Sequence, residues 1–231
     1  MTSPNEPPHA AFQDAAAIAA YAERTRRLVP GWDDLQKMAT LLVAERVPDD
    51  ARVLVVGAGG GAELAAMARS HAGWRFAGVD PSAPMLEMAR ATLGPLAGRV
   101  DFHEGYVATA PAGPFDAATC LLTMHFVPHA ERLPTLREIH RRLKPGAPFV
   151  VAHMSFPQAA DERETWLARY AAFATASGVD PEAARRAATT IGATLPLVGP
   201  DDEEALLAQA GFGAVRLFYA GLAFRGWVAR A

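Results

Sequence analysis

The feature that most constrains the fold is an apolar, mostly β-branched run that leads directly into a glycine-rich turn. Residues 53–56 read Val-Leu-Val-Val, and residues 57–61 read Gly-Ala-Gly-Gly-Gly before a segment that favours a helix. A segment that is apolar at every position predicts a strand covered on both faces, as in a parallel sheet between two helix layers. Ligands of such sheets bind at the carboxyl ends of the strands, where glycines let the backbone approach them. The turn is therefore predicted to hold a ligand.

The glycine spacing alone leaves the ligand open. Gly57, Gly59 and Gly61 follow a G-x-G-x-G pattern, whereas Gly57, Gly59 and Ala62 satisfy the G-x-G-x-x-A fingerprint of dinucleotide-binding proteins. Both patterns place the backbone of this turn, Ala58 included, beside the ligand. The choice between the two ligands depends on the rest of the chain.

The second predicted strand, residues 74–80, ends in an acid that suits a nucleoside. Asp80 follows the glycines by about 20 residues, the spacing at which a carboxylate accepts hydrogen bonds from both ribose hydroxyls. Asp80 and Pro81 also make a good entry to the helix predicted at residues 83–92, so a capping role remains open. Met85, one turn into that helix, suits either the face of an adenine or the apolar core.

Strands and helices alternate along the following chain. Further strands are predicted at residues 100–104, 115–122 and 147–154, and helices at residues 63–71, 83–92 and 131–143. This alternation predicts right-handed crossovers, a parallel sheet and helices on both of its faces. The last two predicted strands, residues 214–219 and 223–229, are joined too closely for a crossover, so they run antiparallel if they pair.

Several strand ends carry further candidate site residues. Tyr106 and Val107 follow the third strand and are expected to face an adenine. His125 and His153 lie at the ends of the fourth and fifth strands, where each could act as a general base or be a buried core residue. The histidines show no metal-ligand spacing, so no metal site is predicted.

Several of these segments together resemble the class I S-adenosylmethionine (SAM) dependent methyltransferases. They are residues 53–61, 79–80, 115–117 and 143–146, and the likeness extends over residues 51–231. It implies an α/β, Rossmann-like methyltransferase fold with a seven-stranded, mostly parallel sheet, one antiparallel strand and helices on both faces. The antiparallel end favours SAM over a nicotinamide cofactor, because the dinucleotide domain of the dehydrogenase type is wholly parallel.

The resemblance implies methyl transfer by in-line displacement, in which the protein mainly aligns the acceptor, the methyl group and the sulfur. The cofactor-binding residues that it implies are Trp32, Gly57, Ala58, Gly59, Gly61, Asp80, Pro81, Met85, Tyr106, Val107 and Leu121. His125 and His153 are the candidate catalytic residues. The chain departs from the family at Val55, where an acid is common, and at Tyr106, where an aspartate is frequent.

Residues 29–32 further resemble the carboxy-SAM synthase and tRNA wobble-uridine methyltransferase branch, in which the tyrosine of a Pro-Gly-Tyr segment touches the cofactor. Trp32 takes the place of that tyrosine, and Leu121 takes the place of the asparagine in the fourth strand of that branch. The arginine that binds the extra carboxylate there has only Arg185 and Arg186 nearby in this chain. Plain SAM is therefore the predicted cofactor.

The chain is expected to divide into three parts. They are a flexible tail at residues 1–10, an N-terminal helical lid at residues 11–50 and a SAM-binding methyltransferase domain at residues 51–231. A helical insertion at about residues 158–199 carries Trp166, Tyr170 and Phe173 at helical spacing. These aromatic residues are expected either to close over the acceptor or only to pin the inserted helices to the sheet.

The composition bounds the partners and the location. A net charge of −3, 51% hydrophobic residues and a single cysteine are typical of a cytoplasmic globular protein and disfavour a broad nucleic-acid surface. No apolar run reaches the length of about 20 residues that spans a membrane, so no membrane partner is predicted. A small-molecule acceptor is predicted, but the arginines around Arg26 leave a tRNA acceptor open. A carboxy-SAM synthase-like enzyme, a SAM-binding protein without turnover and the oligomeric state, a homodimer included, also remain open.

Overall fold

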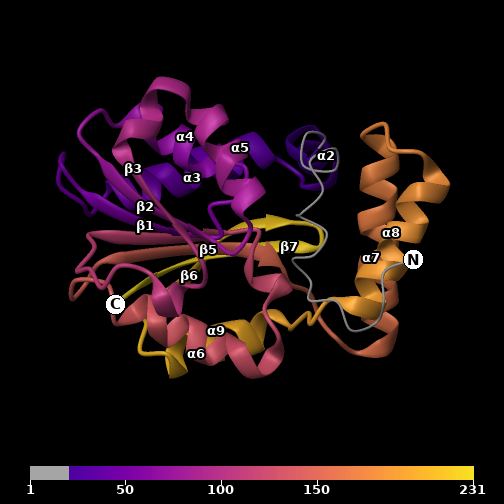
Figure 1. The fold of residues 1–231 in the computed structure, drawn as a ribbon. Coiled ribbons are helices and arrows are strands. Elements are labelled where there is room, and N and C mark those ends of the chain that lie inside the picture. Colours follow the sequence, from indigo (N-terminus) through magenta and orange to yellow (C-terminus); the bar gives the residue numbers. More distant parts are fainter. Residues whose placement is uncertain (1–20) are drawn as a thin grey trace.

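The computed structural model describes residues 21–231, which form one twisted sheet between two layers of helices (Figure 1). The predicted tail and the first part of the predicted lid, residues 1–20, lie outside the described residues. Within residues 21–231 the helices and strands follow the predicted order. None of the helices in this part of the chain combines the length and the apolar composition that crossing a membrane requires.

The sheet has seven strands in the order β3-β2-β1-β4-β5-β7-β6. The strands are β1 (Arg52–Val56), β2 (Arg75–Asp80), β3 (Val100–Glu104), β4 (Ala117–Leu121), β5 (Pro148–Met154), β6 (Gly213–Gly221) and β7 (Phe224–Arg230). β1 pairs in parallel with β2 and β4, and further parallel pairs join β2 to β3 and β4 to β5. β7 runs antiparallel to both β5 and β6, because its connection to β6 is too short for a crossover. The predicted α/β fold and its antiparallel strand are confirmed.

Helices cover both faces of the sheet. One layer holds α3 (Trp32–Ala44), α4 (Ala62–Ser70) and α5 (Ala83–Leu93), and the other holds α6 (His129–His140) and α9 (Pro200–Gln209) (Figure 1). The inserted helices α7 (Ala160–Ala176) and α8 (Pro181–Thr194) stand at one end of the molecule, where α7 packs against α2 (Tyr21–Leu28) (Figure 1). Short 3-10 helices lie at η2 (Gly94–Arg99), η3 (Val107–Thr109) and η4 (Met124–Phe126).

Alternate residues of the strands feed two apolar cores, one on each face. Val53 and Val55 of β1 point into the core that includes α3 and α4, whereas Leu54 and Val56 point into the core that includes α6 and α9. All four side chains are buried. An uninterrupted apolar run is therefore what this position in the sheet requires.

The fourth strand begins later than predicted, at Ala117 instead of residue 115, because the Asp116 side chain takes the place of its backbone carbonyl in the pairing with β1. Asp116 Oδ2 accepts a hydrogen bond from the Arg52 amide at 2.9 Å, and the Asp116 amide donates to the Arg52 carbonyl at 2.8 Å. Lys144 Nζ donates to Asp116 Oδ1 at 2.6 Å. Burial alone would raise the pKa of Asp116, but the hydrogen bonds from Arg52 and Lys144 outweigh it and lower the pKa. The start of β4 is thus anchored to β1 and to the loop before β5.

Candidate functional site

The glycine turn after β1 is held against β2 and packed too closely for other residues. The amides of Gly57 and Ala58 both donate to the carbonyl of Val79, at 2.8 and 2.9 Å. Gly57, with φ of 74°, leaves no room for a Cβ, which would overlap the side chain of Thr123 after β4. Gly61, with φ of 80°, would place a Cβ 2.7 Å from the Cα atom of a residue in α5, Ala89. The turn therefore joins the carboxyl ends of β1, β2 and β4 at one point.

Asp80 closes this turn from the end of β2. Its Oδ2 accepts a hydrogen bond from the Gly59 amide at 2.9 Å, and its Oδ1 accepts one from the Ser82 amide, also at 2.9 Å. The N-cap of α5 is Ser82, whose hydroxyl accepts from the amide of Met85 at 3.3 Å. The capping role left open by the sequence thus falls to Ser82, while Asp80, 9% exposed, holds the glycine turn.

The other residues expected around the cofactor differ in how far they are buried. Met85 is buried, and its Cε would lie 3.4 Å from a Cβ built on Gly59, so it reaches the turn. Tyr106 is 59% exposed at the end of β3, whereas Val107 beside it is buried. Pro81 is half-buried next to Asp80, and Leu121 is buried at the end of β4.

Trp32 is the first residue of α3. It is buried in the same core as Val29 and Leu35. The guanidinium carbon of Arg26 lies 4.8 Å from the centre of its ring, so a cation covers that face. Contact between Trp32 and a cofactor therefore stays a prediction.

The chain takes an uncommon conformation where it leaves β4. Leu122 has φ of 57°, which non-glycine residues seldom adopt. Its amide donates to the Ala152 carbonyl of β5 at 2.5 Å, and the next residue, Thr123, donates its hydroxyl to the Leu121 carbonyl at 3.1 Å. Backbone strain of this kind concentrates at functional sites. The conformation of Leu122 directs the following residue, Thr123, towards Gly57 in the glycine turn.

Glu63, in the first turn of α4, is a buried acid that sequence reasoning missed. It is 7% exposed, and burial raises its pKa to about 8, although the Thr119 side chain and the Leu121 backbone oppose the shift. Glu63 Oε1 and Thr119 Oγ1 each lack a hydrogen-bond partner of standard geometry among the described residues. No sequence signal indicates this burial, because an acid in the first turn of a helix is ordinarily an exposed partner of the helix dipole.

His125 lies in η4, directly after the turn at Leu122. The backbone amide of Met154, the last residue of β5, donates to His125 Nδ1 at 3.3 Å. The side chain is 7% exposed, and burial lowers its pKa well below the ordinary value, with further lowering from His153 and Arg132. His125 is therefore neutral at physiological pH and is placed by β5.

His153 is instead sealed behind the sheet, in a cluster with Arg132 of α6 and Glu203 of α9. All three side chains have no exposed surface. Arg132 Nη1 lies 2.8 Å from Glu203 Oε2, and His153 Nε2 lies 3.3 Å from the same oxygen. Burial opposes the ionisation of Glu203, but His153 and Arg132 outweigh it and lower the pKa of the carboxyl. This placement supports a structural role for His153 and gives it no route to an acceptor.

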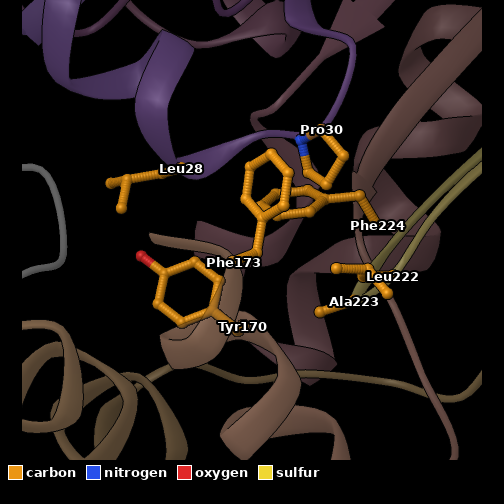
Figure 2. Close-up of a pocket in the computed structure, with 7 residues that line it drawn as sticks. All are labelled: Leu28, Pro30, Tyr170, Phe173, Leu222, Ala223 and Phe224. Carbon is orange, nitrogen blue, oxygen red and sulfur yellow. The ribbon is translucent and has the colours of Figure 1, made fainter. Parts of the chain in front are cut away.

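An apolar crevice opens between α2, α7 and the turn that joins β6 to β7 (Figure 2). It is lined by Leu28, Pro30, Tyr170, Phe173, Leu222, Ala223 and Phe224. Two of the three aromatic residues singled out in the insertion thus line it. The third, Trp166, is not among its lining residues; the guanidinium carbons of Arg169 and Arg225 lie 4.4 and 5.0 Å from the centre of its ring.

Arg185 and Arg186, the arginines considered for an extra carboxylate, lie on α8 and line a separate open hollow with Glu182. Arg186 Nη1 lies 3.5 Å from Glu182 Oε2, and both side chains are largely exposed. Neither arginine is among the residues that line the crevice by α7. Their positions therefore add no support for a carboxylated cofactor.

Comparison with known proteins identifies the same part of the chain. Residues 53–146 match the family model described as a methyltransferase domain. The chain is 28% identical to carboxy-S-adenosyl-L-methionine synthase of Chromohalobacter salexigens, over 94% of this chain and 82% of that protein. It is 35% identical to trans-aconitate 2-methyltransferase of an Azoarcus species, over 62% of this chain and 61% of that protein.

Solved structures share the fold at lower sequence identity. Human N-acetylserotonin methyltransferase in complex with SAM aligns with a TM-score of 0.66 and 15% identity. The alignment covers 99% of this chain but only 60% of the human chain, so the likeness concerns the fold.

Proposed function

This chain carries a class I SAM-dependent methyltransferase domain with SAM as its cofactor, and we propose that it transfers the methyl group of SAM to a small-molecule acceptor. The observation that carries the proposal is the apolar crevice beside the carboxyl end of the sheet (Figure 2). Its walls come from α2, α7 and the β6–β7 turn. The side chains now fill this crevice, so a small, partly apolar acceptor would enter it only as they move apart, and the apolar walls would then exclude water from the reaction.

The glycine turn and Asp80 fit the polar parts of SAM. A carboxylate has about four acceptor positions, so Asp80 can hold the backbone of the turn and accept from ribose hydroxyls as well. Because Gly57 has no Cβ, which would overlap the Thr123 side chain, the turn can lie against the end of β4. SAM itself supplies an electrophilic methyl group, because its sulfonium leaves as a neutral thioether. The task of this chain is therefore to align the acceptor with that methyl group.

The charge distribution favours a small molecule over RNA. Arg26, on α2, pairs with Asp33 at 3.3 Å in an exposed ion pair. Arg142, after the end of α6, is buried against the 108–111 segment, and Arg141 pairs with Glu138. These arginines therefore form no continuous cationic stripe along which a phosphate backbone could lie.

A second candidate is an activity of the carboxy-SAM synthase type. It is supported by the 28% identity to such a protein over 94% of this chain. It requires a cation for an added carboxylate, and the arginines considered for that role, Arg185 and Arg186, lie on the open hollow of α8. Methyl transfer from SAM is therefore the preferred proposal.

Mass spectrometry of small molecules released from the purified protein would separate these candidates, because SAM, its demethylated product and carboxy-SAM have different masses. We expect SAM or its demethylated product, tight binding of both by calorimetry, and no binding of NADH. Incubation with SAM and a panel of small acceptors should then release S-adenosylhomocysteine together with a methylated product. Methyl incorporation into tRNA, weakening steeply with salt, would contradict the proposal.

A further inference from the structure

The hydrogen bond that positions His125 also fixes where its ring carries a proton. The partner of Nδ1 is the backbone amide of Met154, at 3.3 Å. A backbone N–H can only donate, so Nδ1 must be the accepting nitrogen. A neutral imidazole has one N–H, and it must then be on Nε2. The ring edge opposite β5 is therefore a hydrogen-bond donor.

The surroundings of His125 keep the ring in this neutral form. The charged and titratable groups that face it are His153 of β5, at 6.5 Å between ring centres, and Arg132 of α6, which Glu203 of α9 neutralises. Burial lowers the pKa of His125, and His153 and Arg132 lower it further. A neutral ring that already carries its proton on Nε2 cannot remove a second proton there.

The Nε2–H group still requires an acceptor. Among the described residues no side chain or carbonyl accepts a hydrogen bond from it. Other polar atoms without a partner are fully enclosed by the protein, but Nε2 of His125 is not one of them. His125 is more than nine-tenths buried, so bulk water solvates this group poorly. Two residues earlier, Thr123 packs against Gly57, which places η4 beside the glycine turn. The donor thus lies where cofactor and acceptor are expected to meet.

We propose that His125 Nε2–H donates to one oxygen of a carboxylate on the methyl acceptor, and that the product is a methyl ester. This proposal rests on the function proposed above. Carboxylic acids with a pKa of about 4 are ionised at neutral pH, so their oxygen needs no base before it attacks. A hydroxyl acceptor would need one, and His125 has its accepting nitrogen engaged while His153 is sealed behind the sheet.

The reaction balances without a proton. One carboxylate oxygen attacks the methyl carbon, the bond between that carbon and sulfur breaks, and its electron pair stays on sulfur. The products are the methyl ester and neutral S-adenosylhomocysteine, and no proton is released. A hydroxyl acceptor would release one proton for each methyl group transferred, so the proton yield in weak buffer separates the two acceptor classes.

Nuclear magnetic resonance of ¹⁵N-labelled protein tests the tautomer without any acceptor. Long-range proton–nitrogen spectra distinguish the two ring nitrogens, and the signals of His125 are those lost in His125→Gln. We expect Nε2 to carry the proton, with no titration between pH 6 and 8. A proton on Nδ1 in the folded protein would overturn the proposal.

Two substitutions separate a donor from a base, with trans-aconitate as the carboxylate probe. The amide of glutamine in His125→Gln reaches the place of Nε2 and can donate there, whereas asparagine in His125→Asn matches only Nδ1. We expect His125→Gln to keep kcat/KM within about tenfold and His125→Asn to lose about 10- to 100-fold, the scale of one hydrogen bond to a charged group. Loss of about 100-fold or more in both variants would identify a base and overturn the proposal. His129→Gln, an exposed histidine of α6, is the matched control.

The remaining outcomes separate this proposal from the function on which it rests. If calorimetry finds no SAM binding, the proposed function fails, while the spectra still report the tautomer. If SAM binds and only phenols or alcohols are methylated, with one proton released, the function holds and the carboxylate assignment fails. If the bound cofactor is a carboxylated SAM, the carboxylate belongs to the cofactor, and the ester assignment is overturned.

Discussion

Glu63 provides a test of how burial controls ionisation next to the glycine turn. Its pKa is raised from 4.5 to about 8 because the carboxyl loses its water, and Thr119 and Leu121 compensate only in part. At neutral pH the folded protein therefore holds a proton that the unfolded chain has released. The substitution Glu63→Gln replaces the carboxyl by a neutral group of similar shape.

The sign of the effect follows from the proton balance. Between pH 4.5 and about 8 the folded state binds more protons at this residue than the unfolded state, so the free energy of unfolding falls as pH rises. The stabilisation of the folded state by the protonated Glu63 is fully present below pH 4.5 and is lost by about pH 8. One pKa unit corresponds to about 1.4 kcal/mol, so the whole interval amounts to on the order of 5 kcal/mol.

Urea unfolding of the parent and of Glu63→Gln at pH 5, 6, 7 and 8 measures this effect. We expect similar stability at pH 5 and a variant that gains about 1.4 kcal/mol over the parent for each further pH unit. Glu87→Gln is the control, because its side chain is 74% exposed and its pair with Arg90 contributes little. Parallel stability profiles for the parent and Glu63→Gln would refute a raised pKa at Glu63.

Three further predictions test other parts of the structure. Arg132→Met leaves the buried Glu203 without its cation, and we expect urea unfolding to give a loss of about 3–5 kcal/mol, partly restored by adding Glu203→Leu. Gly61→Ala and Gly146→Ala both place alanine at a φ near 80°, but only the Cβ at residue 61 also meets the backbone of α5. We therefore expect Gly61→Ala to lower the free energy of unfolding by about 1–3 kcal/mol more than Gly146→Ala does. Equal losses in the two variants would contradict this packing argument. Asp80→Ala should weaken SAM binding by on the order of 1–3 kcal/mol in calorimetry, whereas unchanged affinity in the folded variant would leave Asp80 only its role in the turn.

The sheet could be predicted from the sequence because its strands carry local signals. The apolar run at residues 53–56 indicates a strand buried on both faces, and the close spacing of the last two predicted strands indicates that they run antiparallel to each other. The start of β4 could not be predicted in this way. Asp116 pairs with Arg52 through its side chain, and the two residues are 64 positions apart.

The buried charges were out of reach for a similar reason. Glu203 lies in an acidic first turn of α9, in which such residues are ordinarily exposed and interact with the helix dipole. Its partner Arg132 is 71 positions away, and His153 comes from a third element. Only the packing of α6 and α9 on the same face of the sheet brings these groups together, so the position of His153 at a strand end left both a general base and a core residue open.

The proposed function divides the chain into a cofactor part and an acceptor part, and the two sets of residues lie in different segments. Gly57, Asp80 and Leu121 all fall within residues 53–146, the segment that matches the methyltransferase domain. The residues that line the apolar crevice all fall outside it, before residue 31 or after residue 169. They meet because β7 returns beside β5 and because the hydroxyl of Tyr219 in β6 donates to the Pro30 carbonyl at 2.5 Å.

Relatives that share only the central domain can therefore keep the cofactor while their acceptors differ. His125 lies inside the domain, next to the cofactor turn, so its hydrogen bond can act on the reacting group of the acceptor while the crevice selects the remainder of the molecule.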